Sequence, residues 1–453
     1  MRFKNLGIFL LLIAIVVVTS LIEGSFAAPA NLRSIVRDTG LYGLISIGVA
    51  MVIITGGIDL SIGSLVALSG VLLVQVVNIR LEPTDFESKI VEVRAEAVVP
   101  LEGPALRLAD PLPDIRGGDQ LSFVSTSGRS AVVIRRVVEV PADPTRSTPG
   151  EMLTFIELRD RLQLLRPGVT VRLDRVTHTN PYLACLIVLA ISATIGLIHG
   201  LLVTWGRLQP FVVTLCGLLI YRGVARVMTG DNQIGLLGAL TDFKALFTGS
   251  VFRIPLPLVS RISGESDSWA TIAWVDFPVS GLILVVVATI AWIFLNRTVW
   301  GRHLLATGEN ERAARYSGVN TSVLIVLAYV ACSTLAGLTG ILFTLELNSV
   351  QPASSGSFYE LYAIAAAVLG GCSLRGGRGA VLSVIAGAAV MRCLYKAIVV
   401  LGISQEWEMV IIGVALLAAV SVDELIARWP SGWLSGWPVK SLFGPPTKQA
   451  GND

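Results

Sequence analysis

Residues 39–79, TGLYGLISIGVAMVIITGGIDLSIGSLVALSGVLLVQVVNI, contain two apolar runs separated by a short glycine-containing turn. A helix needs roughly 20 apolar residues to cross the hydrocarbon core of a bilayer, and both runs approach that length. Outward from this stretch, ten candidate spans can be drawn, at 5–22, 39–56, 61–79, 181–206, 209–229, 272–295, 322–345, 359–373, 379–401 and 408–427. The sequence therefore predicts an all-α polytopic membrane protein of about ten transmembrane helices.

The composition of the chain supports a membrane protein and argues against soluble classes. Of its 453 residues, 53% are apolar and only 15% are charged, and the mean hydropathy is +0.72. Soluble domains carry about 25% charged residues. These values exclude a soluble enzyme, a nucleic-acid-binding protein and a disordered chain. The long runs exclude an outer-membrane barrel, whose strands are about ten residues long. The five cysteines form no CxxC pair, so no metal or redox site is predicted.

The distribution of basic residues predicts the orientation. Lys and Arg collect in the short loops on one side, which the positive-inside rule assigns to the cytoplasm. These loops and the C-terminal tail hold Arg2, Lys4, Arg207, Arg297, Arg302, Arg312, Arg315, Arg375, Arg378, Arg428, Lys440 and Lys448. With ten spans both termini are cytoplasmic, and Arg33 and Arg37 in the first outer loop are exceptions. The first run also resembles a cleavable signal peptide, but the ten-span parity favours a retained helix.

Residues 80–178 differ in composition from the rest of the chain. Charges are dense there, Pro and Gly recur, and β-branched residues alternate with others. This pattern predicts strands, and hence a small β-rich extracytoplasmic insert. It divides the chain into N-terminal helices at 1–79, the insert, a transmembrane core at 179–428 and a cytoplasmic tail at 429–453. The insert is interpreted either as a docking module or as an addition to a loop that tolerates insertion.

The first motif is GGIDLSIGS at 56–64. Its glycines, Gly56, Gly57 and Gly63, let backbones approach closely or let a helix unwind at membrane depth, as in transporters. Asp59 and Ser61 are placed to cap the helix that follows. An acidic residue inside a membrane core favours a functional role, and a plain capped turn is the alternative.

A second glycine-rich motif, GGCSLRGGRG, occupies 370–379. Five glycines in ten residues predict a tight turn with close helix packing. The structural glycines are Gly370, Gly371, Gly376, Gly377 and Gly379. The motif resembles GGIDLSIGS in its glycine pair and in the apolar helix that follows, so an internal repeat is one interpretation and chance similarity of glycine turns the other.

The third motif lies in the loop after the span 272–295 and runs from Trp300 to Gly318. It predicts an amphipathic helix at 309–316, closed by Ser317 and Gly318. A short polar helix between two spans is well placed to press into a groove of a partner, and an arginine-rich surface loop is the alternative. The chain contains no Gly-Lys dipeptide, and so no GxxxxGK[ST] phosphate-binding loop. No catalytic residue is predicted, and any ATP would be used by another subunit.

Four ordered motifs give the chain a family resemblance. They are GGIDLSIGS at 56–64, Gln209-Pro-Phe-Val-Val-Thr-Leu with Arg222-Gly223, the stretch 301–318, and the run from Glu360 to Gly379. Together they resemble the membrane permeases of sugar ATP-binding-cassette importers of the ribose, xylose and galactose type, which are grouped with branched-chain amino-acid permeases. The resemblance covers nearly all of the chain except the insert.

The resemblance implies a permease that works as a pair, with a second copy or a paralogue, surrounded by membrane lipid. Two cytoplasmic ATPase subunits would bind beneath it, and an extracytoplasmic solute-binding protein would deliver the sugar. The stretch 296–321 would be the coupling loop. Its matching residues are Gly308, Glu309, Asn310, Arg312, Ala313, Ala314, Arg315 and Gly318. No cofactor is expected on this chain, and ATP is used by the partner.

The chain departs from the family pattern at three positions. Tyr362 stands where the family usually has an acidic residue, and Arg392 and Lys396 lie in a span where small or amide residues are usual. Intramembrane cations are costly and often functional, so the solute need not be an ordinary pentose. The residues predicted to line the solute pathway are Asp59, Ser61, Gln209 and Arg392.

Three other functions remain open at this point. They are an ion-coupled secondary transporter, for which Asp59 and Glu360 offer slight support, a branched-chain amino-acid permease, and a membrane-anchored interaction protein whose insert does the work. Copurification of an ATPase would separate the importer from the secondary transporter, and deletion of the insert would test the last.

Overall fold

A computed structural model describes residues 6–77, 80–94, 105–110, 119–125, 128–141, 152–158, 166–177, 179–236, 240–256, 273–414, 417 and 421. Within these residues six helices are long and apolar enough to cross a membrane. They are α2 (Pro29–Ile54), α4 (Pro181–Thr204), α5 (Pro210–Thr229), α8 (Val279–Arg297), α11 (Thr321–Leu347) and α13 (Val381–Val400). Three shorter apolar helices join them, α1 (Leu6–Ile22), α3 (Ile62–Val77) and α12 (Tyr359–Leu369). Residues 408–414 are also helical, and the rest of the predicted span 408–427 lies largely outside the described residues.

Two of the predicted span boundaries are wrong. The helix predicted at 39–56 begins ten residues earlier, at Pro29, where proline suits the first helical position. Arg33 and Arg37 therefore lie in the helix α2 and not in a loop. The span predicted at 272–295 begins with a strand, β9 (Ala273–Pro278), which pairs with β8 (Ser250–Leu256), and the helix α8 starts only at Val279.

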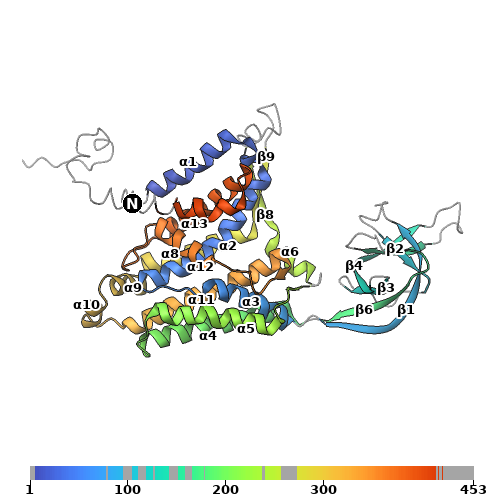
Figure 1. Cartoon of the computed structure of the whole chain (residues 1–453), viewed down its shortest axis with the longest axis horizontal. Helices are drawn as coiled ribbons and strands as arrows, with labels where there is room; N and C mark the ends of the chain where they lie inside the picture. Colours follow the sequence, from blue (N-terminus) through green and yellow to red (C-terminus); the bar gives the residue numbers. More distant parts are fainter. Residues whose placement is uncertain are drawn as a thin grey trace, which may run out of the picture.

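The helices form one bundle with two distinct ends (Figure 1). At one end, here called the α10 end, lie α9 (Val299–Glu309), α10 (Glu311–Tyr316) and the start of α1. At the opposite end, called the barrel end, lie α6 (Thr241–Thr248) and the β8–β9 hairpin. The core of the bundle is apolar, and its largest wholly buried side chain is Tyr329 on α11.

The helices α3 and α12 are too short to cross a bilayer alone. α12 has 11 residues, which is about 16 Å, against a hydrocarbon core of about 30 Å. It begins inside the bundle, because the ring of Tyr359 packs 4.9 Å from that of Tyr42 on α2. α3 starts beside it, with Gly63 against Gly356. From this shared level α3 runs toward the barrel end and α12 toward the α10 end (Figure 1).

Between α3 and α4 the chain forms six strands, which lie beyond the barrel end of the bundle (Figure 1). They are β1 (Arg80–Arg94), β2 (Ala105–Leu108), β3 (Gln120–Ser125), β4 (Gly128–Pro141), β5 (Met152–Leu158) and β6 (Thr170–Thr177). Their order is β1-β2-β5-β4-β3-β6, closed into a barrel with antiparallel neighbours. Closure leaves no open edge strand, and alternate residues such as Leu121, Phe123 and Leu173 fill the interior.

Candidate functional site

The three sequence motifs meet at the α10 end of the bundle. The N–H of Gly377 donates to the carbonyl of Ile54 at 2.9 Å, and Gly308, in the last turn of α9, packs directly on both groups. Gly376, with φ of +89°, lies against Gly308 and Gly56. We call these five residues the glycine junction. A side chain on Gly308 would collide with the backbone at the end of α2 and in the loop before α13, so glycine is required there for close approach.

The remaining predicted structural glycines also lie at close contacts or turns. Gly63 packs against the carbonyl of Gly356 and the carboxylate of Glu360, and Gly57 packs against the hydroxyl of Tyr329. In the second motif, Gly370 packs on the backbone of Ser383 and Val384, Gly379 lies on the side chain of Ile54, and Gly371 has a φ of +81°.

The coupling loop predicted at 296–321 holds two helices, and the helix predicted at 309–316 corresponds to the second of them. α9 ends at Glu309, and Asn310 adopts an extended backbone whose side chain accepts a hydrogen bond from the N–H of Ala313 at 3.0 Å. The expected helix over 309–316 is therefore α10, which starts at Glu311. Asparagine broke the helix because its side chain is a good N-cap. Gly318, with φ of +83°, follows α10 as the closing residue.

The surface of α10 is polar and open. Arg312, Ala313 and Arg315 are exposed, whereas Ala314 is buried against the bundle. Arg315 pairs with Glu311 at 2.6 Å and also reaches Thr321. Tyr316 is 92% exposed, and it was missed by the sequence analysis although an aromatic ring ending a polar helix was visible there. Glu309 lies apart from this surface, 3.9 Å from Arg378 beside the glycine junction.

Asp59 is completely buried in the bundle, just before α3. Its Oδ1 accepts hydrogen bonds from the N–H and the hydroxyl of Ser61, at 2.9 and 2.7 Å. The predicted turn before a helix is therefore present. Both hydrogen bonds come from Ser61, two positions further along the chain, so the carboxylate stabilises this turn locally.

Around Asp59 lie polar side chains from three other helices. His199 of α4 and Tyr221 of α5 share a hydrogen bond of 2.7 Å, and the ring of Tyr329 on α11 stands perpendicular to His199. All three lie within electrostatic range of Asp59. The sequence analysis did not assign these residues, although polar side chains inside apolar runs were a signal for them. We call this group, with Ser61, the Asp59 cluster.

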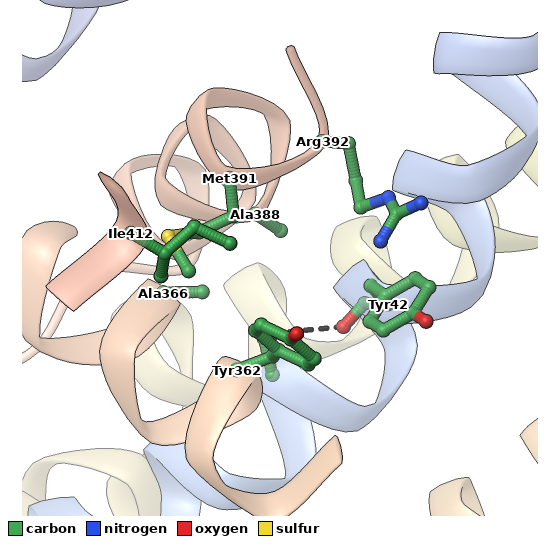
Figure 2. A pocket seen from close by; sticks show the side chains of 8 residues that line it. Tyr42, Tyr362, Ala366, Ala388, Met391, Arg392 and Ile412 are labelled. Carbon is green, nitrogen blue, oxygen red and sulfur yellow. Dashed lines mark hydrogen bonds between the residues drawn. The ribbon is translucent and has the colours of Figure 1, made fainter. Parts of the chain in front are cut away.

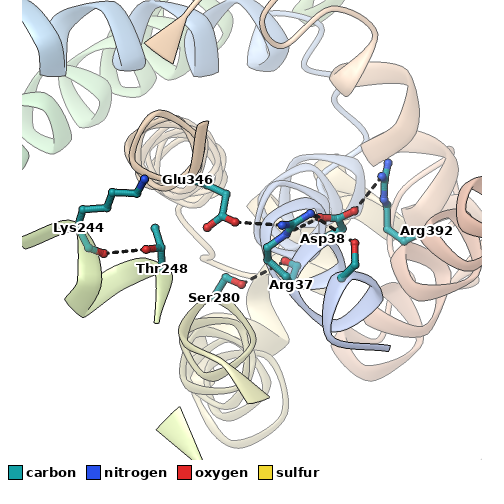
Figure 3. Close-up of polar contacts among 8 residues, drawn as sticks. Arg37, Asp38, Lys244, Thr248, Ser280, Glu346 and Arg392 are labelled. Carbon is teal, nitrogen blue, oxygen red and sulfur yellow. Dashed lines mark hydrogen bonds and ion pairs between the residues drawn. The ribbon is translucent and has the colours of Figure 1, made fainter. Parts of the chain in front are cut away.

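Arg392 belongs to a second polar group within the helical bundle. Its Nη2 lies 3.2 Å from Oδ2 of Asp38, whose Oδ1 accepts from Nε of Arg37 at 3.0 Å (Figure 3). Arg37 in turn reaches Glu346 at 3.0 Å. The result is a chain of alternating charges that joins α11, α2 and α13 and sums to zero. Because each charge has a partner of opposite sign, these residues can lie within the bundle.

A small pocket opens beside this charge chain (Figure 2). The guanidinium of Arg392 is held between two rings, 4.3 Å from the centre of Tyr42 and 4.5 Å from that of Tyr395, which is cation–π geometry. The pocket is lined by Tyr42, Ser46, Tyr362, Ala366, Ala388, Met391, Arg392 and Ile412. The hydroxyl of Tyr362 donates to Glu408 at 3.0 Å. We call this the Arg392 pocket.

The four predicted pathway residues do not form one site. Asp59 and Ser61 share the Asp59 cluster, and Arg392 lines its own pocket between α2, α12 and α13. Gln209 is exposed at the N-cap of α5, where its carbonyl accepts from the N–H of Val213. Their role in transport remains a prediction. Over the described part of the chain, no group of three or more His, Cys, Asp or Glu side chains is placed to hold a metal ion.

Apolar helices of spanning length, buried charge pairs between them and an exposed polar helix at one end define a multi-pass membrane protein. The chain belongs to the family of branched-chain amino acid transport system permease components, whose model matches residues 31–420. It is 27% identical to the ribose import permease protein of Bacillus subtilis, over 93% of this chain and 92% of that one.

Two further relatives are also named as sugar transport permeases. The ribose import permease protein of Escherichia coli K12 is 28% identical over 93% of this chain and 94% of its own. The D-allose transport system permease protein of the same strain is 30% identical, over 57% of this chain and 72% of its own. No solved structure matches the chain.

Proposed function

We propose that this chain is the permease subunit of an ATP-driven importer that moves a monosaccharide or a related small solute across the inner membrane. Its family membership and its similarity to ribose import permeases along nearly the whole of both chains support this. Relatives named for ribose and allose favour a sugar over a branched-chain amino acid. Because the sequence has no GxxxxGK[ST] loop, separate ATPase subunits supply the energy.

The glycine junction beside α9 and α10 is the main structural support for this proposal. α10 presents exposed Arg312, Arg315 and Tyr316 at one end of the bundle. Arg and Tyr are the residue types that dominate binding energy at protein interfaces. A displacement of α9 and α10 is passed on directly, because Gly308 touches the end of α2 and the loop before α13. ATPase subunits that move α10 would therefore move α2 and α13, two of the helices that line the Arg392 pocket.

The two ends of the bundle define the proposed orientation. The α10 end is cytoplasmic, which puts the start of α1 and the arginines of α9 and α10 on the cytoplasmic side, as the positive-inside rule requires. The barrel end is extracytoplasmic, where the barrel would lie beside a docked solute-binding protein. The ten predicted crossings then comprise the six long helices, α1, the short helices α3 and α12, and the helix that begins at 408.

A second permease subunit completes the proposed assembly. Two ATPase subunits that close on each other need two coupling helices, and a second copy of this chain or a paralogue would supply the other. The outer faces of α4 and α5 carry many exposed apolar side chains, among them Leu186, Leu219 and Val227. They suit contact with lipid tails or with this second subunit.

Copurification from mild detergent tests the proposal. The tagged chain should bring down an ATPase subunit from its native membrane, and the triple variant Glu309→Ala, Arg312→Ala, Arg315→Ala should lose most of it. Tyr316→Ala should reduce recovery at least fivefold. The matched control is Tyr182→Ala, since Tyr182 is 61% exposed at the start of α4, near the barrel end. Recovery of no ATPase with the wild-type chain would contradict the proposal and favour an ion-coupled transporter.

A further inference from the structure

We propose that the Asp59 cluster is a proton-binding site within the helical bundle. While the bundle shields them from water, Asp59 and His199 together hold one proton, and they release it when water reaches them. The inference goes beyond the proposed function, because its ligand is a proton and its test needs neither an ATPase subunit nor a solute.

The segment that leads into α3 places Asp59 beside His199. The carbonyl of Ile58, the residue before Asp59, accepts a hydrogen bond from the hydroxyl of Thr214 on α5 at 3.2 Å. Gly217, one turn further along α5, packs on the ring of His199. The two ionisable side chains therefore face the same stretch of α5, within electrostatic range of each other.

Buried polar atoms without partners mark this cluster. Oδ2 of Asp59, Nδ1 of His199 and the hydroxyl of Tyr329 are all buried, and none has a hydrogen-bond partner among the described residues. Asp59 and Tyr329 are wholly buried, and His199 is nearly so. Most buried polar groups in proteins are hydrogen-bonded, so each exception needs an explanation. A site where protons are gained and lost explains why two of these atoms belong to ionisable groups.

The charge of the pair fixes how many protons it holds. A buried charge is costly unless a charge of opposite sign compensates it. A carboxylate beside a neutral imidazole leaves one negative charge, and an imidazolium beside a neutral carboxyl leaves one positive charge. With a single proton the pair is neutral overall, whichever of Asp59 and His199 carries it. The proton therefore belongs to the pair and not to one residue.

Other titratable groups also face Asp59. They are Tyr221 on α5, and Tyr329 and Cys332 on α11. In the described part of the chain, neither these groups nor His199 have a lysine or an arginine as an electrostatic partner. The ordinary pKa values, about 10 for Tyr and about 8.5 for Cys, lie above the range from pH 6.5 to 8. In that range the pair is the group that exchanges a proton.

The glycine junction connects the pair to the motion of the bundle. Gly56 belongs to the junction and lies three positions before Asp59. A displacement of α9 and α10 would therefore shift the segment that carries Asp59. In water the pKa values are about 3.9 for Asp and about 6.5 for His, so a wetted pair is without the proton above pH 6.5. Because the state that binds more protons is favoured at lower pH, raising the pH favours the opened bundle.

Reversible unfolding of the full-length chain tests the site. The purified protein in mild detergent is unfolded with sodium dodecyl sulfate at pH 6.5 and at pH 8, which exposes the pair to water. The unfolding equilibrium constant of the wild type should rise about tenfold more over this range than that of Asp59→Asn. The variant removes the ionisable carboxyl but keeps an oxygen for Ser61. His303→Gln, which changes a histidine on α9 outside the cluster, should respond to pH as the wild type does.

Infrared spectroscopy provides a measurement that does not depend on unfolding. His199→Gln leaves Asp59 as the member of the pair that can hold the proton, so the C=O stretching band of a protonated carboxyl should appear at pH 6.5. The double variant Asp59→Asn/His199→Gln should lack that band.

The inference is overturned if the wild type and Asp59→Asn respond equally to pH. It is also overturned if His199→Gln shows no more of the carboxyl band than the double variant. Failure of the proposed function is a different result, namely no ATPase subunit recovered with the wild-type chain, and it would leave the proton site standing.

Discussion

Asp59 and Asp38 are both carboxylates within the helical bundle, but they are held in different ways. Asp59 binds the backbone and hydroxyl of Ser61, two residues away. Asp38 binds the guanidiniums of its neighbour Arg37 and of Arg392, which is 354 positions distant, and Arg37 reaches Glu346, 309 positions away. The first arrangement is local and stabilises a turn. The second joins three helices, so its loss should affect the assembly of the bundle.

Asp38→Ala should have the largest effect of the changes considered for this comparison. It leaves the side chain of Arg392, which is only 11% exposed, without its ionic partner. Breaking a buried pair in this way costs about 3–5 kcal/mol, so we expect a large fall in the melting temperature of the detergent-solubilised protein. The double variant Asp38→Ala/Arg392→Leu should recover much of that loss. Equal melting temperatures for Asp38→Ala and the wild type would show that the charge chain does not hold the helices together.

Asp59→Ala should have an intermediate effect. It removes two hydrogen bonds from a wholly buried turn, and leaving buried donors unsatisfied costs about 1–3 kcal/mol. Asp59→Asn keeps an oxygen that can accept from Ser61, and it should be less destabilising. The measurement is thermal unfolding of the two variants side by side. If Asn is as harmful as Ala, the charge of Asp59 itself stabilises the bundle, through its electrostatic interaction with His199 and Tyr329.

Gly308→Ala tests whether the glycine junction couples ATP hydrolysis to the membrane helices, apart from its effect on stability. A methyl group there would press on the carbonyl of Ile54 and the N–H of Gly377, and the loops of the glycine junction would have to shift. Overpacking of this kind costs about 1–3 kcal/mol. We expect recovery of the ATPase subunit to stay within twofold of the wild type while sugar-stimulated ATP hydrolysis falls at least tenfold. Gly318→Ala serves as the control, because no atom crowds that position. A loss of ATPase recovery that parallels the loss of hydrolysis would contradict the mechanical role of the junction.

Arg315→Gln should have the smallest effect on stability. Its pair with Glu311 has the same ionic chemistry as Arg392 with Asp38, but its side chain is 65% exposed. Exposed pairs four residues apart on a helix contribute about 0.3–0.5 kcal/mol, so the melting temperature should hardly change. Recovery of the ATPase subunit should still fall, since Arg315 lies on the proposed docking surface. A marked loss of stability would mean that water does not screen the ion pair between Arg315 and Glu311.

The class of the protein and most of its helices could be predicted from the sequence. Long apolar runs predict membrane helices because a bilayer satisfies no backbone hydrogen bond, so hydropathy alone locates them. Local motifs could also be predicted. The turn at Asp59 and Ser61 and the helix before Gly318 depend on neighbours within a few residues. The exact starts of α2 and α8 could not be predicted, because they depend on contacts with distant residues. Arg37 in α2 pairs with Glu346 of α11, and the strand β9 before α8 pairs with β8.

Which residues act together could not be predicted, because it depends on how the helices pack. Gly56, Gly308 and Gly377 meet although they come from three motifs far apart in the chain, and Arg392 finds Asp38 and Tyr42 across the bundle. Gln209 was grouped with Asp59 by the sequence, yet it lies exposed at the start of α5. The physical reason is that hydropathy reports how much of a helix is apolar, whereas ion pairs, ring stacking and backbone contacts depend on which faces of the helices pack together.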